Sequence, residues 1–175
     1  SFLTLYPTFA AITSVDADHL DIYGTHQEVL QAFGQFAEQI KEGGLLWHED
    51  VVEPLQQAVP ATAHLNADVY GELAPQESLE GRGWAAGYAQ VGHAASGPHG
   101  EARFELHLRG QAPMEVCWRL PGQHNAANAT AAAYLACRAG VDPAAIPPAL
   151  AAFPGVARRF EVKYRTEEKA VIDDY

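Results

Sequence analysis

Several ionisable side chains lie close together near the start of the chain, in residues 13–21. Three are aspartates and one is an imidazole, His19. They follow the apolar run 9–12, which the pattern predicts as a buried strand. Ligands bind at the carboxyl ends of strands in open α/β sheets, and Mg²⁺ prefers oxygen ligands such as those of Asp16 and Asp18. The competing interpretation is a solvated loop in which an aspartate caps the next helix.

A second group of polar side chains follows the dipeptide Pro-Gly at residues 121–122. His124 and Asn128 lie four residues apart and therefore share one face of a helix, with Asn125 in the same first turn. An amide both donates and accepts hydrogen bonds, as reading the edge of adenine requires, and an imidazole ring can stack on a base. The alternative is that both asparagines satisfy backbone groups at the start of the helix.

The elements that would position these residues predict an α/β fold. Apolar residues recur at helical spacing over 28–40, and strand-like and helix-like segments alternate up to residue 58, as in a parallel sheet. Between residues 67 and 120, short strands separated by Gly and Pro turns predict a small antiparallel β subregion. The alanine-rich segment 125–138 predicts a helix that approaches the sheet closely. We therefore expect a mostly parallel sheet flanked by helices, with a smaller antiparallel subsheet.

Composition narrows the class of protein. The chain has 175 residues, 48% of them hydrophobic, which suits one globular domain. Its formal net charge of −11 disfavours a nucleic-acid partner. The sequence contains neither an apolar run long enough to span a membrane nor a basic signal-peptide start, so we expect a cytoplasmic protein. The two cysteines, Cys117 and Cys137, are interpreted as core thiols.

Three blocks, taken in order with Ser-Phe-Leu at the start, resemble the central ATP-binding domain of the Mur ligase family. They are Asp-Ala-Asp-His ending at His19, His-Asn-Ala-Ala-Asn at residues 124–128, and Arg-Arg-Phe-Glu followed by Val-Ile-Asp-Asp-Tyr at the end. The resemblance spans nearly the whole chain, although residues 49–119 contribute little to it. It implies a P-loop NTPase-like fold, incomplete here, with residues 1–175 forming part of a single ATP-binding domain.

The resemblance also implies roles for individual residues. His19 would bind Mg²⁺ that bridges the γ-phosphate of ATP and the acceptor carboxylate. His124, Asn125 and Asn128 would bind the nucleotide. Arg159 would contact the nucleotide or its phosphates and take part in catalysis, and Asp174 would accept hydrogen bonds from the ribose hydroxyls. The chemistry agrees, because a guanidinium suits phosphate and a carboxylate suits a diol. The other histidines, His48 among them, are interpreted as surface or structural residues.

The implied activity is a step of peptidoglycan precursor synthesis. It is the ATP-dependent amide ligation of L-alanine to UDP-N-acetylmuramate through an acyl phosphate. Some relatives use a carbamylated lysine in the helix after the acidic motif, but residues 25–40 contain no lysine, which favours the alanine-adding branch. The glycine-rich phosphate loop of the family is not found. We therefore expect a piece of a longer ligase, without the UDP-sugar domain, the P-loop and the C-terminal domain, and inactive alone.

Three alternatives remain open. The first is the family's ligase that recycles a whole tripeptide onto UDP-N-acetylmuramate. The second is a non-catalytic family domain used for protein association. The third is a freestanding metal hydrolase built on Asp16, Asp18 and His19, which would act without ATP.

Overall fold

The computed structural model describes most of the chain. The described residues are 2–18, 20–74, 77–78, 80, 82–84, 86–91, 102–118, 120, 122–159, 161–166 and 168–174. The α-helices are α1 (Leu20–Tyr23), α2 (His26–Glu38), α3 (Glu49–Ala58), α4 (Gln123–Arg138) and α5 (Ile146–Ala152). Short 3-10 helices are η1 (Phe2–Thr4), η2 (Pro60–His64) and η3 (Pro143–Ala145). The strands are β1 (Ala10–Ile12), β2 (Leu45–His48), β3 (Ala67–Leu73), β4 (Gly87–Val91), β5 (Ala102–Leu108), β6 (Met114–Trp118), β7 (Glu161–Arg165) and β8 (Ala170–Asp173).

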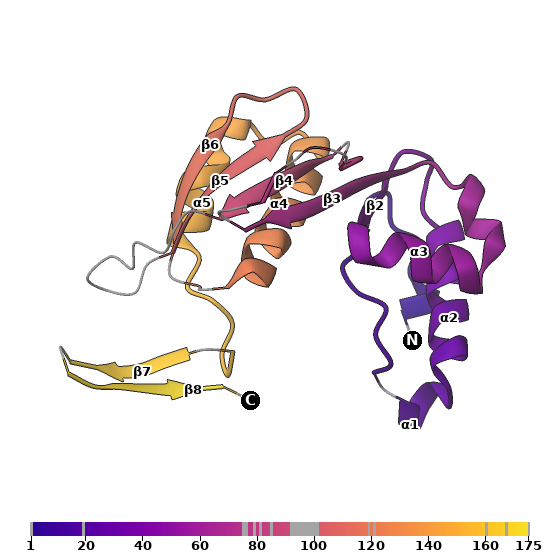
Figure 1. Cartoon of the computed structure of the whole chain (residues 1–175), viewed down its shortest axis with the longest axis horizontal. Coiled ribbons are helices and arrows are strands. Elements are labelled where there is room, and N and C mark those ends of the chain that lie inside the picture. The colour runs from indigo at the N-terminus through magenta and orange to yellow at the C-terminus, as the bar shows by residue number, and fades with distance from the viewer. Residues whose placement is uncertain are drawn as a thin grey trace.

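One six-stranded sheet forms the centre of the molecule, with its strands in chain order from β1 to β6 (Figure 1). The pairs β1–β2, β2–β3 and β3–β4 are parallel, whereas β4–β5 and β5–β6 are antiparallel. A separate antiparallel pair, β7 and β8, extends away from this body (Figure 1). The predicted fold class, a mostly parallel sheet with helices and a smaller antiparallel sheet, is confirmed.

Residues 67–120, for which we expected a small antiparallel subregion, supply four strands of the main sheet. β3 continues the parallel part, and β4 to β6 form an antiparallel extension of it. β5 is half-exposed because its side chains alternate between the two faces of the sheet. Phe104, Leu106 and Leu108 are buried, whereas Glu105 is exposed. The antiparallel sheet that stands apart is instead β7–β8.

Helices cover both faces of the sheet, as the side chains of β2 show. Leu46 packs into a core with the alanines of α4, whereas Leu45 and Trp47 pack into a second core with α2 and α3. Successive side chains of a strand point to opposite faces, so the two cores lie on opposite sides. All of β2 is consequently buried, as expected of an inner parallel strand.

Helix α4 is held against the sheet by small side chains and by polar contacts at its carboxyl end. Five of its alanines are buried, which allows the close approach expected from the sequence. The Tyr134 hydroxyl donates a hydrogen bond to the carboxylate of Asp68 at the start of β3, and Arg138 donates to the carbonyl oxygen of Gly43 at 2.7 Å. Gly140, with φ of 98°, ends the helix in the left-handed conformation that glycine adopts readily. These contacts place the first turn of α4 near the carboxyl end of β3.

No helix among the described residues combines the length and the apolar character that crossing a membrane requires.

Candidate functional site

The larger of two cavities near the start of α4 has a volume of about 740 Å³. Helix α4 contributes His124, Asn125 and Asn128 to its wall. The segment after α5 contributes Arg159, and Asp174, which directly follows β8, also lines the cavity. Five residues nominated from two of the three blocks of sequence thus line one cavity. Apolar side chains form most of the remaining wall: Trp118, Leu120, Ala129, Ala132, Leu150, Phe153 and Val156.

These apolar residues were not nominated from the sequence as part of a site. Trp118 is only 4% exposed, with its ring edge-on to Phe104 at 5.4 Å between centroids. It nevertheless lines the cavity. An apolar slot with a few polar groups at its rim is the usual construction of a site for a small organic ligand.

A tight turn presents Arg159 to the cavity. Arg159 N donates to the carbonyl oxygen of Val156 at 3.1 Å, and Arg158 between them has φ of 62°, the left-handed region that non-glycine residues rarely adopt. The backbone N–H of Arg158 donates to the carboxylate of Glu161 at 3.0 Å, which fixes the turn to the start of β7. Arg158 itself is exposed and does not line the cavity.

The conformation of Gly122 sets the position of His124. Gly122 precedes α4 with φ of 102°, and a Cβ added to it would lie 2.7 Å from Cε1 of His124. The imidazole therefore folds back against a backbone that only glycine tolerates. His124 and Asn128 line both the larger cavity and a smaller one of about 300 Å³. The first turn of α4 is the wall between the two.

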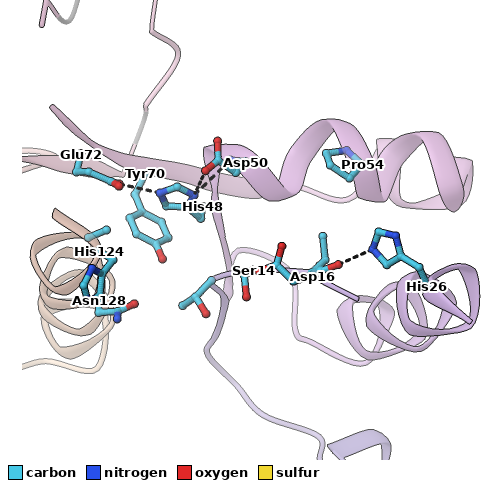
Figure 2. A pocket seen from close by; sticks show the side chains of 13 residues that line it. Ser14, Asp16, His26, His48, Asp50, Pro54, Tyr70, Glu72, His124 and Asn128 are labelled. Atoms are coloured by element: carbon cyan, nitrogen blue, oxygen red, sulfur yellow. Dashed lines mark hydrogen bonds and ion pairs between the residues drawn. The ribbon is translucent and has the colours of Figure 1, made fainter. Parts of the chain in front are cut away.

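The smaller cavity lies at the carboxyl ends of β1, β2 and β3, and the side chains around it are drawn in Figure 2. His48 ends β2, and the strand register places Tyr70 of β3 directly opposite it. Glu72 lies two residues further along β3 and therefore on the same face. Sequence reasoning missed this group, because no motif marks side chains that meet only through strand register.

His48 is held by two contacts. Its Nε2 donates to the carboxylate of Glu72 at 2.8 Å, and its Nδ1 accepts from the backbone N–H of Asp50 at 3.3 Å, which caps α3. Burial alone would lower the pKa of His48, but the hydrogen bond and charge of Glu72, with Asp50 and Glu49 nearby, outweigh it and raise that pKa above its usual value. His48 is thus a buried structural residue rather than a surface one.

His19, nominated for Mg²⁺ and catalysis, lies outside the described residues. Asp16 lines the smaller cavity, and Asp18 is exposed. In the described part of the chain, no group of three or more His, Cys, Asp or Glu side chains is arranged to hold a metal ion. The metal role of His19 stays a prediction.

Comparison with known proteins identifies the family. The family model for the Mur ligase middle domain matches residues 1–136. The chain belongs to the Mur ligase family. Over its whole length this Mur ligase domain is 34% identical to the UDP-N-acetylmuramate–L-alanine ligase of Bifidobacterium longum subsp. infantis and 33% identical to that of Saccharopolyspora erythraea. It covers 35% and 34% of those proteins, so it spans about a third of the length of these curated relatives.

Solved structures show the same fold. MurF from Acinetobacter baumannii superimposes with a TM-score of 0.72 at 22% identity, over 99% of this Mur ligase domain and 35% of that chain. UDP-N-acetylmuramate-alanine ligase MurC from Thermotoga maritima gives a TM-score of 0.66 at 24% identity, over 99% and 36%. At these identities the likeness extends to the fold alone, and the site must be argued from this domain's own residues.

Proposed function

We propose that the protein carrying this domain is an ATP-dependent ligase of peptidoglycan precursor synthesis that joins L-alanine to UDP-N-acetylmuramate. In this proposal the larger cavity binds the adenosine part of ATP. The observation that carries it is the convergence of five side chains with nucleotide-binding chemistry, from three distant segments, on one apolar cavity of about 740 Å³. The names of the curated relatives support L-alanine as the acceptor.

Each polar residue of the larger cavity has a chemical part in the proposal. Asn125 and Asn128 donate to and accept from the edge of adenine, while Trp118 and Phe153 enclose its faces. Asp174 accepts from the ribose hydroxyls, and Arg159 neutralises phosphate charge with a fixed fork of donors. His124 forms the wall behind the base.

The reaction requires ATP because a carboxylate does not react directly with an amine. ATP supplies the phosphoryl group that converts the muramate carboxylate into an acyl phosphate, which the amine of L-alanine then attacks. Mg²⁺, with His19 as its predicted ligand, would offset the charge of the phosphates. In this proposal the described residues hold and orient the nucleotide.

The test is phosphate release by the full-length protein with ATP, Mg²⁺ and UDP-N-acetylmuramate, with L-alanine or the tripeptide as acceptor. We expect release that depends on L-alanine and falls about 100-fold or more in His19→Ala. His64→Ala is the matched control, because His64 is an exposed histidine in η2 that lines neither cavity, and it should leave the rate unchanged.

Other outcomes select other functions. A preference for the tripeptide would indicate the recycling ligase. No release with either acceptor, from a folded full-length protein, would leave a non-catalytic domain that serves protein association. Hydrolysis that needs metal but no ATP would indicate a metal hydrolase.

A further inference from the structure

The smaller cavity contains a buried hydroxyl without a partner. Tyr70 is 0% exposed, and its Oη has no hydrogen-bond partner among the residues that the structure describes. A hydroxyl removed from water without a compensating hydrogen bond destabilises the folded protein. Tyr70 lines the smaller cavity, and its hydroxyl points into the space around Ser14 and Asn128 (Figure 2). Such a group is unexplained by the packing of the sheet.

The ring of Tyr70 is held in place by its neighbours. His48 meets it edge to face, with 5.2 Å between ring centroids and 77° between ring planes. His48 is itself fixed by Glu72 on one nitrogen and by the first turn of α3 on the other. Burial, followed by the charge of Glu72, raises the pKa of Tyr70 well above its usual value, so the hydroxyl keeps its proton. Tyr70 is therefore an oriented hydrogen-bond donor.

The larger cavity shares two lining residues with the cavity that contains this donor. His124 and Asn128 line both cavities, so a ligand that reaches the wall between them comes close to Tyr70. The lining of the smaller cavity also includes the carboxylates of Asp16, Asp50 and Glu72. These charges repel phosphate, whereas a neutral acceptor such as a ring nitrogen or a ribose oxygen meets no such repulsion.

We propose that Tyr70 is a nucleotide-binding residue whose hydroxyl donates a hydrogen bond to a neutral acceptor atom of the adenosine moiety. The inference rests on the proposed function and extends it to a residue outside the three motifs. Because Tyr70 is fully buried here, binding must turn the side chain of His124 or Asn128 to open the wall between the cavities. His48 and Glu72 act as positioning residues for the donor.

The test is Tyr70→Phe in the full-length protein, which removes one oxygen and keeps the ring. We expect affinity for ATP and for adenosine, measured by titration calorimetry, to fall by the same factor of about tenfold. The melting temperature without ligand should stay equal or rise, since the lost hydroxyl had no partner. Tyr88→Phe is the control, because Tyr88 stacks on His107 at 4.3 Å, lines neither cavity and should leave affinity unchanged.

Three results would overturn the inference while leaving the ligase proposal standing. They are an unchanged affinity in Tyr70→Phe, a loss confined to ligands that carry phosphate, and a lower melting temperature without ligand, which would reveal an internal partner for the hydroxyl. If the wild-type protein binds neither ATP nor adenosine, the proposed function fails and this inference fails with it.

Discussion

The two cavities meet at the first turn of α4, but their walls are built differently. The charged residues in the wall of the larger one, Arg159 and Asp174, come from a turn and from the end of β8, and both are exposed. The smaller one lies at the carboxyl ends of parallel strands, and its strand residues His48, Tyr70 and Glu72 form a chain of contacts. The polar residues of the larger cavity thus come from separate segments of the chain, whereas those of the smaller cavity include a network between neighbouring strands.

This difference indicates that the two cavities have different roles. Exposed charges on separate segments stay hydrated until a charged ligand binds, so the free protein pays little desolvation cost for them. A network between strands can instead hold one group in a fixed direction. We therefore expect changes in the larger cavity to act mainly on binding and catalysis. Changes to His48 and Glu72 in the smaller cavity should act mainly on the orientation of Tyr70 and on the pH dependence of stability.

The largest effect is expected from Arg159→Ala. If Arg159 pairs with phosphate as proposed, removing its guanidinium should lower ligase activity of the full-length protein by about 100-fold, with little change in melting temperature because the side chain is exposed. Steady-state phosphate release measures the first quantity and calorimetry the second. Arg158→Ala is the matched control, since Arg158 is the adjacent arginine and does not line the cavity. An equal loss in both variants would show that the arginine role is wrongly placed.

A change at the shared wall should affect both cavities. Gly122→Ala forces alanine into φ of 102° and places its Cβ 2.7 Å from the ring of His124, so we expect a loss of stability of about 2 kcal/mol together with weaker ATP binding. Denaturant unfolding and ATP titration measure the two effects.

Gly140→Ala separates backbone strain from the collision with His124. Gly140 has a similar φ of 98° at the other end of α4, but a Cβ there meets nothing within 4 Å. This variant should lose stability and keep its affinity for ATP. If Gly122→Ala also keeps its affinity, His124 has no part in the site.

The sequence predicts features formed by contiguous residues better than contacts that depend on the register between strands. The helix at residues 125–138 and the acidic end of the last strand were predictable, because their signals lie in contiguous residues or simple periodicity. The fold class was predictable from alternating elements. Nothing in the sequence tells which residue of β3 faces His48, since a shift of one residue in register would turn Tyr70 to the other face. His19 remains a prediction from resemblance.

The smallest effect, and the most specific to the smaller cavity, is expected from Glu72→Gln. The folded-state pKa of His48 is raised above its usual value, so the pair adds stability that is fully present below about pH 6 and is lost as pH rises through the folded-state pKa. The free energy of unfolding of the wild type should therefore fall between pH 6 and pH 8, and this fall should be smaller in Glu72→Gln.

Asp50→Asn provides the comparison for that measurement. The carboxylate of Asp50 lies 3.5 Å from Nδ1 of His48 but its side chain is 85% exposed, so solvent weakens its attraction for the imidazolium. Its variant should keep nearly all of the wild-type pH dependence. If Asp50→Asn flattens the profile as much as Glu72→Gln does, the general negative field around His48 is responsible. The hydrogen bond between His48 of β2 and Glu72 of β3 would then not be what distinguishes this cavity from the larger one.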